Sequence, residues 1–319
     1  MKIKPIIIVA GEPNSIFVEI LIKSLKKKKF KSPIILIISK KVFLSQMRKL
    51  KLKIPFEIIN ENNLSNLILD NKKLNLINVN YDFKKPFEKI STKSNKYIEK
   101  SFNIALKLVK TGFTNKFING PVSKKYFLNN KFLGITEYLA KKTNTNNFAM
   151  LIFNKKLSVV PVTTHLPLKL VAKNITKNLI IKKILLINNF YKNYLNINPK
   201  IAVTGLNPHC ESIDAYNEDK KIIEPAVKYL KNKINVTGPV AADTSFLKNN
   251  RKNYDLIVGM YHDQVLTPLK TLFEYNAINI TIGLPFLRIS PDHGPNENMM
   301  GKNKSNPKSL YESIKFLDF

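Results

Sequence analysis

Short runs of consecutive apolar residues, many of them β-branched, recur along the chain and predict buried strands. They are continuously apolar rather than alternating, as expected of parallel strands covered on both faces. The clearest runs are residues 5–10, 33–39, 116–119, 157–163, 200–204 and 255–260. Between them, apolar residues recur at helical spacing over residues 15–28, 94–110, 136–142, 176–194 and 217–231. This alternation of strands and helices predicts an α/β fold with right-handed crossovers.

One stretch has no clear pattern of apolar residues. Residues 60–93 are rich in Asn and Lys, and we expect a sheet edge or an irregular insertion there. The chain has no internal repeat and no long linker. Its 319 residues are enough for one large domain or two ordinary ones, so length alone permits a two-domain division.

The charge of the chain first suggests a nucleic-acid-binding protein. There are 53 Lys and Arg against 22 Asp and Glu, a formal net charge of +31. However, only Arg48, Arg251 and Arg288 are arginine, and the remaining cations are lysine. Lys, Asn and Ile are favoured together when coding DNA is rich in A and T. We therefore interpret most of the excess charge as compositional bias on solvated surfaces.

Several protein classes are excluded by missing motifs. The ten glycines include no G-x-G-x-x-G fingerprint and no P-loop. Cys210 is the only cysteine, which fits a reducing compartment. No apolar run approaches the roughly 20 residues of a membrane helix, and residues 6–10 are too short for a signal-peptide core. We expect a cytoplasmic protein that contacts no membrane.

Three of the four histidines lie just beyond the carboxyl end of a predicted strand. They are His165, His209 and His262. Ligands of open α/β sheets bind at this edge, and imidazoles from separate strands can form an open metal site. A single histidine in a loop is more often structural, and the spacing matches no local metal motif, so the three together fit a metal site and a structural role equally well. Asp263 could orient a ligand or bind substrate, whereas Cys210 is better explained as a small buried thiol.

A second group of polar residues follows. It consists of Lys270, Asn279 and Arg288. A cation that grips a phosphate or carboxylate at two points has reason to be arginine, and here an Arg stands out among many lysines. The alternative for Arg288 is a structural ion pair with Asp292 or a helix cap. Residues 119–124 form a glycine-containing turn after another strand, either facing a phosphate or simply starting a loop.

Taken together, these residues resemble the 4-hydroxythreonine-4-phosphate dehydrogenases of pyridoxal phosphate biosynthesis. The resemblance runs in order from Gly11 to the C-terminus, and no single motif would be specific. The motifs are TTHLPL at 163–168, GLNPH at 205–209, GP at 238–239 with ADT at 242–244, MYHDQ at 260–264, NITIGLPF at 279–286 and DHG at 292–294.

The resemblance implies a homodimer with the isocitrate and isopropylmalate dehydrogenase-like fold, in which two α/β/α domains flank a cleft and the active site lies near the dimer interface. We expect residues 1–130 with 285–319 to form one domain and 131–284 the other. The family oxidises the C3 hydroxyl of 4-phosphooxy-L-threonine with NAD or NADP, and the β-keto acid loses CO2 to give 3-amino-2-oxopropyl phosphate.

Family roles carry over to matching positions of this chain. The resemblance implies that Zn²⁺, Mg²⁺ or Co²⁺ is held by the three histidines. Substrate contacts are implied for Thr136, Lys270, Asn279 and Arg288. Lys270, Asp243 and a water on the metal are candidates for the general base, with Asp263 as a further catalytic candidate. The resemblance does not identify residues that bind the nicotinamide cofactor.

The chain departs from the family pattern at three places. The usual Gly-His-Thr-Glu reads Gly134-Ile135-Thr136-Glu137, so a substrate-contacting imidazole is lost. The early glycine-rich turn, residues 11–19, lacks two glycines, and residues 210–217 lack others. Ile135 leaves open the same chemistry on threonate or erythronate 4-phosphate. A different alternative is a basic relative that has lost catalysis and binds nucleic acid.

Overall fold

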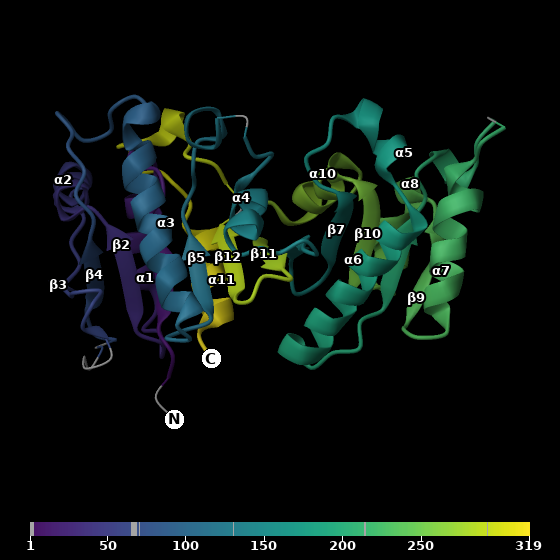
Figure 1. The fold of residues 1–319 in the computed structure, drawn as a ribbon, viewed down its shortest axis with the longest axis horizontal. Helices are drawn as coiled ribbons and strands as arrows, with labels where there is room; N and C mark the ends of the chain where they lie inside the picture. Colours follow the sequence, from purple (N-terminus) through teal and green to yellow (C-terminus); the bar gives the residue numbers. More distant parts are fainter. Residues whose placement is uncertain (1–2, 65–68, 70, 130, 214, 292) are drawn as a thin grey trace. The chain divides into compact units, whose positions relative to one another are not determined.

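The computed structural model describes residues 3–64, 69, 71–129, 131–213, 215–291 and 293–319. The chain divides into two compact units. Met1–Tyr138 and Pro285–Phe319 form the first unit, and Leu139–Leu284 forms the second. Each unit consists of a sheet with flanking helices, so the predicted α/β class is confirmed (Figure 1). Among the described residues, no helix is both long and apolar enough to cross a membrane.

The strands of the first unit are parallel and lie in the order β3-β4-β2-β1-β5-β12. Their bounds are β1 Ile6–Val9, β2 Ile34–Ile38, β3 Phe56–Ile58, β4 Leu74–Asn78, β5 Lys116–Asn119 and β12 Leu287–Pro291. Every residue of β1, β2 and β5 is buried. This burial explains why β1 and β2 are uninterrupted apolar runs, whereas β5 is apolar only at Phe117 and Ile118.

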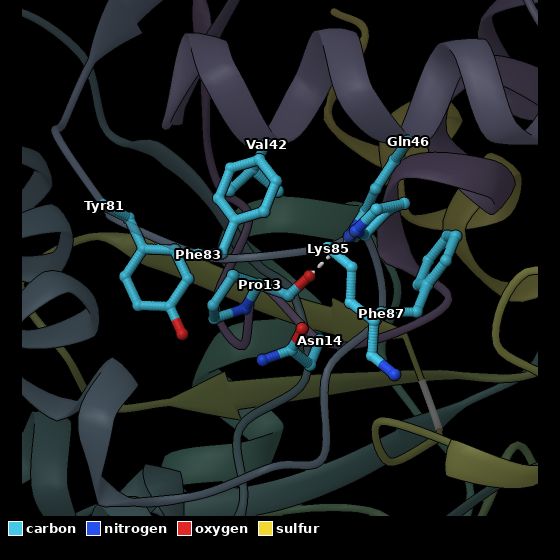
Figure 2. A pocket seen from close by; sticks show the side chains of 9 residues that line it. Pro13, Asn14, Val42, Gln46, Tyr81, Phe83, Lys85 and Phe87 are labelled. Carbon is cyan, nitrogen blue, oxygen red and sulfur yellow. Dashed lines mark hydrogen bonds between the residues drawn. The ribbon is translucent and has the colours of Figure 1, made fainter.

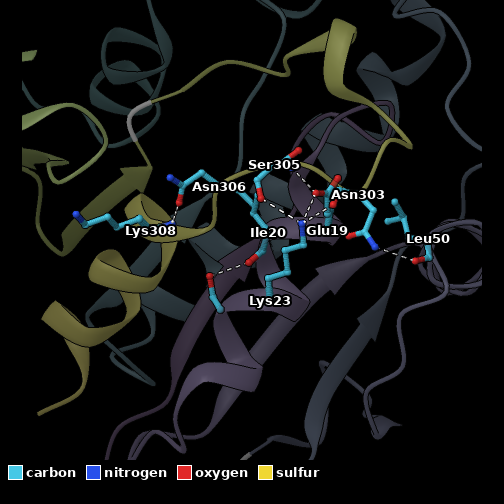
Figure 3. Close-up of polar contacts among 9 residues, drawn as sticks. Glu19, Ile20, Lys23, Leu50, Asn303, Ser305, Asn306 and Lys308 are labelled. Carbon is cyan, nitrogen blue, oxygen red and sulfur yellow. Dashed lines mark hydrogen bonds and ion pairs between the residues drawn. The ribbon is translucent and has the colours of Figure 1, made fainter.

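Helices of the first unit include α1 Phe17–Lys27, α2 Lys40–Leu50, α3 Asn95–Lys110 and α11 Lys308–Leu317. α1 packs against α2 and α11, and α3 packs on β1 and β2. A polar contact joins α1 to the segment before α11 (Figure 3): Lys23 Nζ donates to Glu19 Oε1 at 2.7 Å and to the carbonyls of Asn303 and Ser305. Ser305 N also donates to Glu19 Oε1, at 2.6 Å. Residues from opposite ends of the chain therefore form one side of this unit.

The second unit has the strand order β11-β6-β7-β10-β8-β9. Its strands are β6 Ala149–Phe153, β7 Ser158–Thr163, β8 Ile201–Thr204, β9 Val236–Val240, β10 Leu256–Tyr261 and β11 Ile278–Ile282. β7, β10, β8 and β9 are parallel to one another, whereas β6 is antiparallel to both β7 and β11. The parallel strands bring their carboxyl ends to one edge, which is the edge where ligands bind in such sheets.

Helices cover the second sheet. They are α5 Val171–Asn174, α6 Lys177–Phe190, α7 Glu224–Lys231, α8 Ala242–Ser245, α9 Lys248–Arg251 and α10 His262–Phe273, while α4, Ile135–Lys142, begins in the first unit. α10 packs on β7 and β10, with Val265, Leu266 and Leu269 in the apolar core. α6 packs on β6, β7 and α7. The helix predicted over 176–194 ends at Phe190 and continues as a π-helical turn.

The unclear stretch 60–93 contains β4, which lies between β3 and β2 rather than at the edge. An irregular segment follows it. The edge strand of the sheet is instead β3, which comes just before this stretch in the sequence. β4 has only five residues in a stretch rich in Asn and Lys, which is too few for hydrophobic periodicity to distinguish a strand from a loop.

Candidate active site

The three histidines follow neighbouring parallel strands of the second unit. His165 comes two residues after β7, His209 lies in the turn after β8, and His262 is the first residue of α10, directly after β10. Because β10 pairs with both β7 and β8, the three strand ends lie side by side at the carboxyl edge of the sheet. The sequence predicted that each histidine follows a buried strand at this edge, but not that the three strands are neighbours.

His165 and His262 form a close pair. Their ring centroids are 5.9 Å apart. Zn–N bonds are about 2.0–2.1 Å long, so two imidazoles on one ion have centroids no more than roughly 6.5 Å apart, and this pair fits that limit. His262 Nδ1 lies 2.6 Å from Asp263 Oδ1. This contact leaves Nε2 of His262 available to a ligand, and a carboxylate behind a histidine is a common support for metal binding.

His209 has a different neighbour. It lies in a short turn with a backbone φ of +55°, and its Nδ1 is 3.9 Å from Asp243 Oδ2. Asp243 is in α8, which follows β9, the strand next to β8. Both side chains are exposed. The exposed imidazole is therefore accessible to a ligand from outside the chain.

The described part of one chain brings these donors together in pairs. It contains no group of three or more His, Cys, Asp or Glu side chains close enough to hold a metal ion. The donor types fit a divalent ion such as Zn²⁺ or Co²⁺, and the His165–His262 pair has suitable spacing. His209 does not complete that pair within the chain.

Two further residues predicted to bind substrate belong to the second unit. Lys270 is an exposed residue of α10. Asn279 is in β11, and its Oδ1 is buried without a hydrogen-bond partner among the described residues. Buried polar atoms are nearly always hydrogen-bonded in folded proteins, so an orphaned acceptor indicates a missing donor.

Arg288 and Thr136 belong to the first unit. Arg288, in β12, is fully buried. Its Nε donates to Asn119 Oδ1 at 2.7 Å and its Nη1 donates to Thr136 Oγ1 at 3.3 Å. Burial lowers the pKa of Arg288 to about 9, an effect that the nearby charge of Glu137 opposes. The alternative partner Asp292 lies outside the described residues.

Asn119 was not recognised from the sequence as a partner of Arg288. Its Nδ2 donates to the carbonyl of Gly120 at 2.8 Å, which directs Oδ1 toward the guanidinium. The two residues are 169 positions apart and meet because β12 pairs with β5. The only available signal was the polar residue at the carboxyl end of β5.

Glu12, in the loop after β1, is a second unexpected polar residue. Its carboxylate accepts hydrogen bonds from Asn14 N at 3.0 Å and Ser94 Oγ at 2.9 Å. Burial raises the pKa of Glu12 to about 7.

The next residues of this loop, Pro13 and Asn14, line a cavity with aromatic walls (Figure 2). Its volume of about 10 Å³ leaves room for about one water molecule and not for a cofactor ring.

Comparison with known proteins decides the family. The family described as "Pyridoxal phosphate biosynthetic protein PdxA" matches residues 29–317. The chain belongs to the PdxA family. The resemblance found in the sequence motifs is thereby confirmed, and this PdxA-family chain is a dehydrogenase.

Relatives of this PdxA-family chain carry two names. The 4-hydroxythreonine-4-phosphate dehydrogenase of Sulfurihydrogenibium sp. is 38% identical over 96% of this chain and 95% of its own length. The D-threonate 4-phosphate dehydrogenase of Pectobacterium atrosepticum is 36% identical over 66% of each chain. The crystal structure of 4-hydroxythreonine-4-phosphate dehydrogenase from Klebsiella pneumoniae matches with a TM-score of 0.84 and 28% identity, over 99% of this chain and 97% of that one.

Proposed function

We propose that this chain oxidises the C3 hydroxyl of 4-phosphooxy-L-threonine with NAD or NADP, and that the resulting β-keto acid loses CO2 to give 3-amino-2-oxopropyl phosphate. One observation supports this proposal above all. His165, His209 and His262 follow three neighbouring parallel strands of a PdxA-family chain, at the edge where α/β sheets bind ligands.

His165, His209 and His262 would hold a divalent metal ion. When bound, such an ion supplies positive charge that stabilises negative charge developing on the substrate oxygen. Neutral imidazoles leave that positive charge undiminished. Asp263 supports His262 by accepting from Nδ1, which orients Nε2 outward.

A homodimer forms part of the proposal, with the active site near its interface. The described residues of one chain contain no complete three-donor cluster, and His209 is exposed. A second copy could supply the donors that one copy lacks. A dimer would therefore explain how all three histidines of the motif can serve a metal site although one chain groups its donors only in pairs.

Four residues would bind the substrate. Arg288 provides a two-pronged cation for a phosphate or carboxylate, and Asn119 holds its guanidinium. Thr136 also accepts from Arg288, and its hydroxyl would contact the same group of the substrate. Because Arg288 is fully buried, an anion reaches it only when neighbouring side chains make room. Asn279 Oδ1 can accept from a substrate ammonium or hydroxyl, and exposed Lys270 can contact an anionic group.

The general base must take the proton of the C3 hydroxyl. Lys270, Asp243 and Asp263 are the candidates. Asp243 lies beside His209 and Asp263 beside His262, so each carboxylate is next to a proposed metal ligand. A proton acceptor at that position would act on a hydroxyl held by the same ion.

A second substrate is supported by a specific residue. Ile135 precedes Thr136 in the first turn of α4 and cannot form a hydrogen bond with a substrate. Relatives named D-threonate 4-phosphate dehydrogenase match this chain at 36% identity. We therefore propose D-threonate 4-phosphate, which has a hydroxyl in place of the amino group, as the alternative substrate of the same site.

Substitution of one proposed ligand tests the metal site. His262→Ala should abolish NAD(P) reduction and reduce bound metal, while the circular dichroism spectrum stays that of a folded protein. His293→Ala is the matched control, because His293 is the one histidine outside the proposed ligand set and should leave the metal content unchanged. Full activity and metal content in His262→Ala would refute the proposed metal site.

A further inference from the structure

The side chain of Gln264 connects two strand ends that carry proposed metal ligands. Its Nε2 donates to the carbonyl of Gly205 at 2.7 Å. Its Oε1 accepts from Met260 N at 2.7 Å and from Thr204 Oγ1 at 3.0 Å. Both ends of one amide are therefore engaged, with β8 on one side and β10 on the other.

The position of Gln264 determines which residues these hydrogen bonds hold together. Gln264 lies in the first turn of α10, two residues after His262. Gly205 begins the five-residue segment that ends at His209. The amide therefore ties the start of the His209 turn to the residues that flank His262. Movement of either strand end would break at least one of its hydrogen bonds.

A close approach of α10 to β10 makes this bridge possible. A Cβ atom on Gly259 would lie 2.4 Å from Val265 Cγ1 and 3.0 Å from Gln264 Oε1. Only glycine leaves room for the first turn of α10 at this distance. The bridge is thus built into the backbone rather than being a chance surface contact.

A buried carboxylate also holds the turn that contains His209. Asp219, which is 1% exposed, accepts from Leu206 N at 2.7 Å, from Asn207 N at 3.1 Å and from Asn207 Nδ2 at 2.9 Å. With Gln264 bound to Gly205, three consecutive residues before Pro208 are fixed. The turn that presents His209 therefore has little freedom.

We propose that Gln264 is a positioning residue for the metal site, which holds the strand ends that carry His209 and His262 so that each imidazole is presented for metal binding without rearrangement. This role rests on the proposed function. It does not require Gln264 to touch metal or substrate. Partners that hold ligands in place commonly change metal affinity by about 10- to 100-fold when removed.

The test compares Zn²⁺ affinity among variants of the full-length protein, measured by competition with a chromogenic chelator. Gln264→Leu removes all three hydrogen bonds, and Gln264→Glu keeps the shape but replaces the donor to Gly205 with an oxygen. We expect both to bind Zn²⁺ about 10- to 100-fold more weakly. The d–d absorption bands of the Co²⁺-loaded variants should also change, because they report ligand geometry.

Gln46→Leu is the matched control. Gln46 is the other glutamine of the chain, is buried in the first unit, and donates to the carbonyl of Pro13 at 2.6 Å. The Gln46→Leu variant should bind Zn²⁺ with the same affinity as the wild-type protein. Wild-type affinity and cobalt spectra in both Gln264 variants, or an equal loss in Gln46→Leu, would overturn the positioning role alone. Wild-type protein that binds no Zn²⁺ or Co²⁺ would instead overturn the proposed metal site, and the positioning role with it.

Discussion

Arg288 Nε donates a hydrogen bond of 2.7 Å to Asn119 Oδ1, between two buried side chains of the neighbouring strands β12 and β5. Burial of the guanidinium lowers the pKa of Arg288 to about 9, which means that desolvation disfavours its charge. Hydrogen bonds that Arg288 donates to the neutral side chains of Asn119 and Thr136 fix the plane of its guanidinium, and the nearby charge of Glu137 favours its charged form. The arrangement suits a cation that is to bind an anion.

Arg288→Lys tests this role. Lysine keeps the charge but cannot bond to Asn119 and Thr136 through a planar fork. We expect the KM for the phosphorylated substrate to rise about 10- to 100-fold, the equivalent of losing one or two hydrogen bonds to a charged group. The measurement is steady-state kinetics, with exposed Arg48→Lys as the control. A KM equal to that of wild type would show that Arg288 does not bind the substrate.

Glu12 predicts a pH dependence of stability. Burial raises the pKa of Glu12 from 4.5 to about 7, so the folded protein holds a proton that the unfolded chain releases. This stabilising contribution is complete below pH 4.5 and is lost as the pH rises through 7. Glu12→Gln does not titrate, so its free energy of unfolding relative to wild type should increase by up to about 3 kcal/mol between pH 4.5 and 8.5.

Urea unfolding at several pH values measures this difference. Glu224→Gln, at an exposed position of α7, controls for the loss of one negative charge. A difference between Glu12→Gln and wild type that stays constant across the pH range would contradict the buried, proton-binding carboxyl.

Gly11 and Gly112 have similar backbone angles but different surroundings, so comparing them tests how closely the backbone packs around Gly11. Both have positive φ, +76° and +74°. A Cβ on Gly11 would lie 2.3 Å from the carbonyl oxygen of Pro121, whereas a Cβ on Gly112 would meet nothing within 4 Å. Gly112→Ala should therefore cost about 1–2 kcal/mol from its dihedral angles alone. Gly11→Ala should cost about 2 kcal/mol more, because backbone must move. Equal losses in chemical denaturation would refute the close approach.

The sequence predicted the fold best where strands are fully buried. β1 and β2 are uninterrupted apolar runs, and they and the fully buried β5 were located to within a residue or two. β11 and β12 were not predicted, because each includes polar residues such as Asn279 and Arg288 that interrupt the apolar pattern. β9 contains Gly238 and Pro239, which normally indicate a turn.

The sequence predicted the edge of the sheet at which the candidate site lies, but not the contacts between its side chains. Histidines placed after buried strands could be assigned to the carboxyl end of the sheet. The pairing of His209 with Asp243 depends on a turn with positive φ at His209, which no periodicity reveals. The contact between Arg288 and Asn119 depends on which strands are neighbours, and strand order is a property of the whole fold. Local patterns therefore located the residues, and tertiary structure determined their partners.

The most direct test of the proposed function is the reduction of NAD or NADP, followed by absorbance at 340 nm, with 4-phosphooxy-L-threonine as substrate and Zn²⁺, Mg²⁺ or Co²⁺ added in turn. D-threonate 4-phosphate is assayed in parallel. We predict metal-dependent reduction with 4-phosphooxy-L-threonine, accompanied by release of CO2, and loss of both when a chelator removes the metal. No reduction of either cofactor with either substrate, by folded protein supplied with each metal, would contradict the proposal.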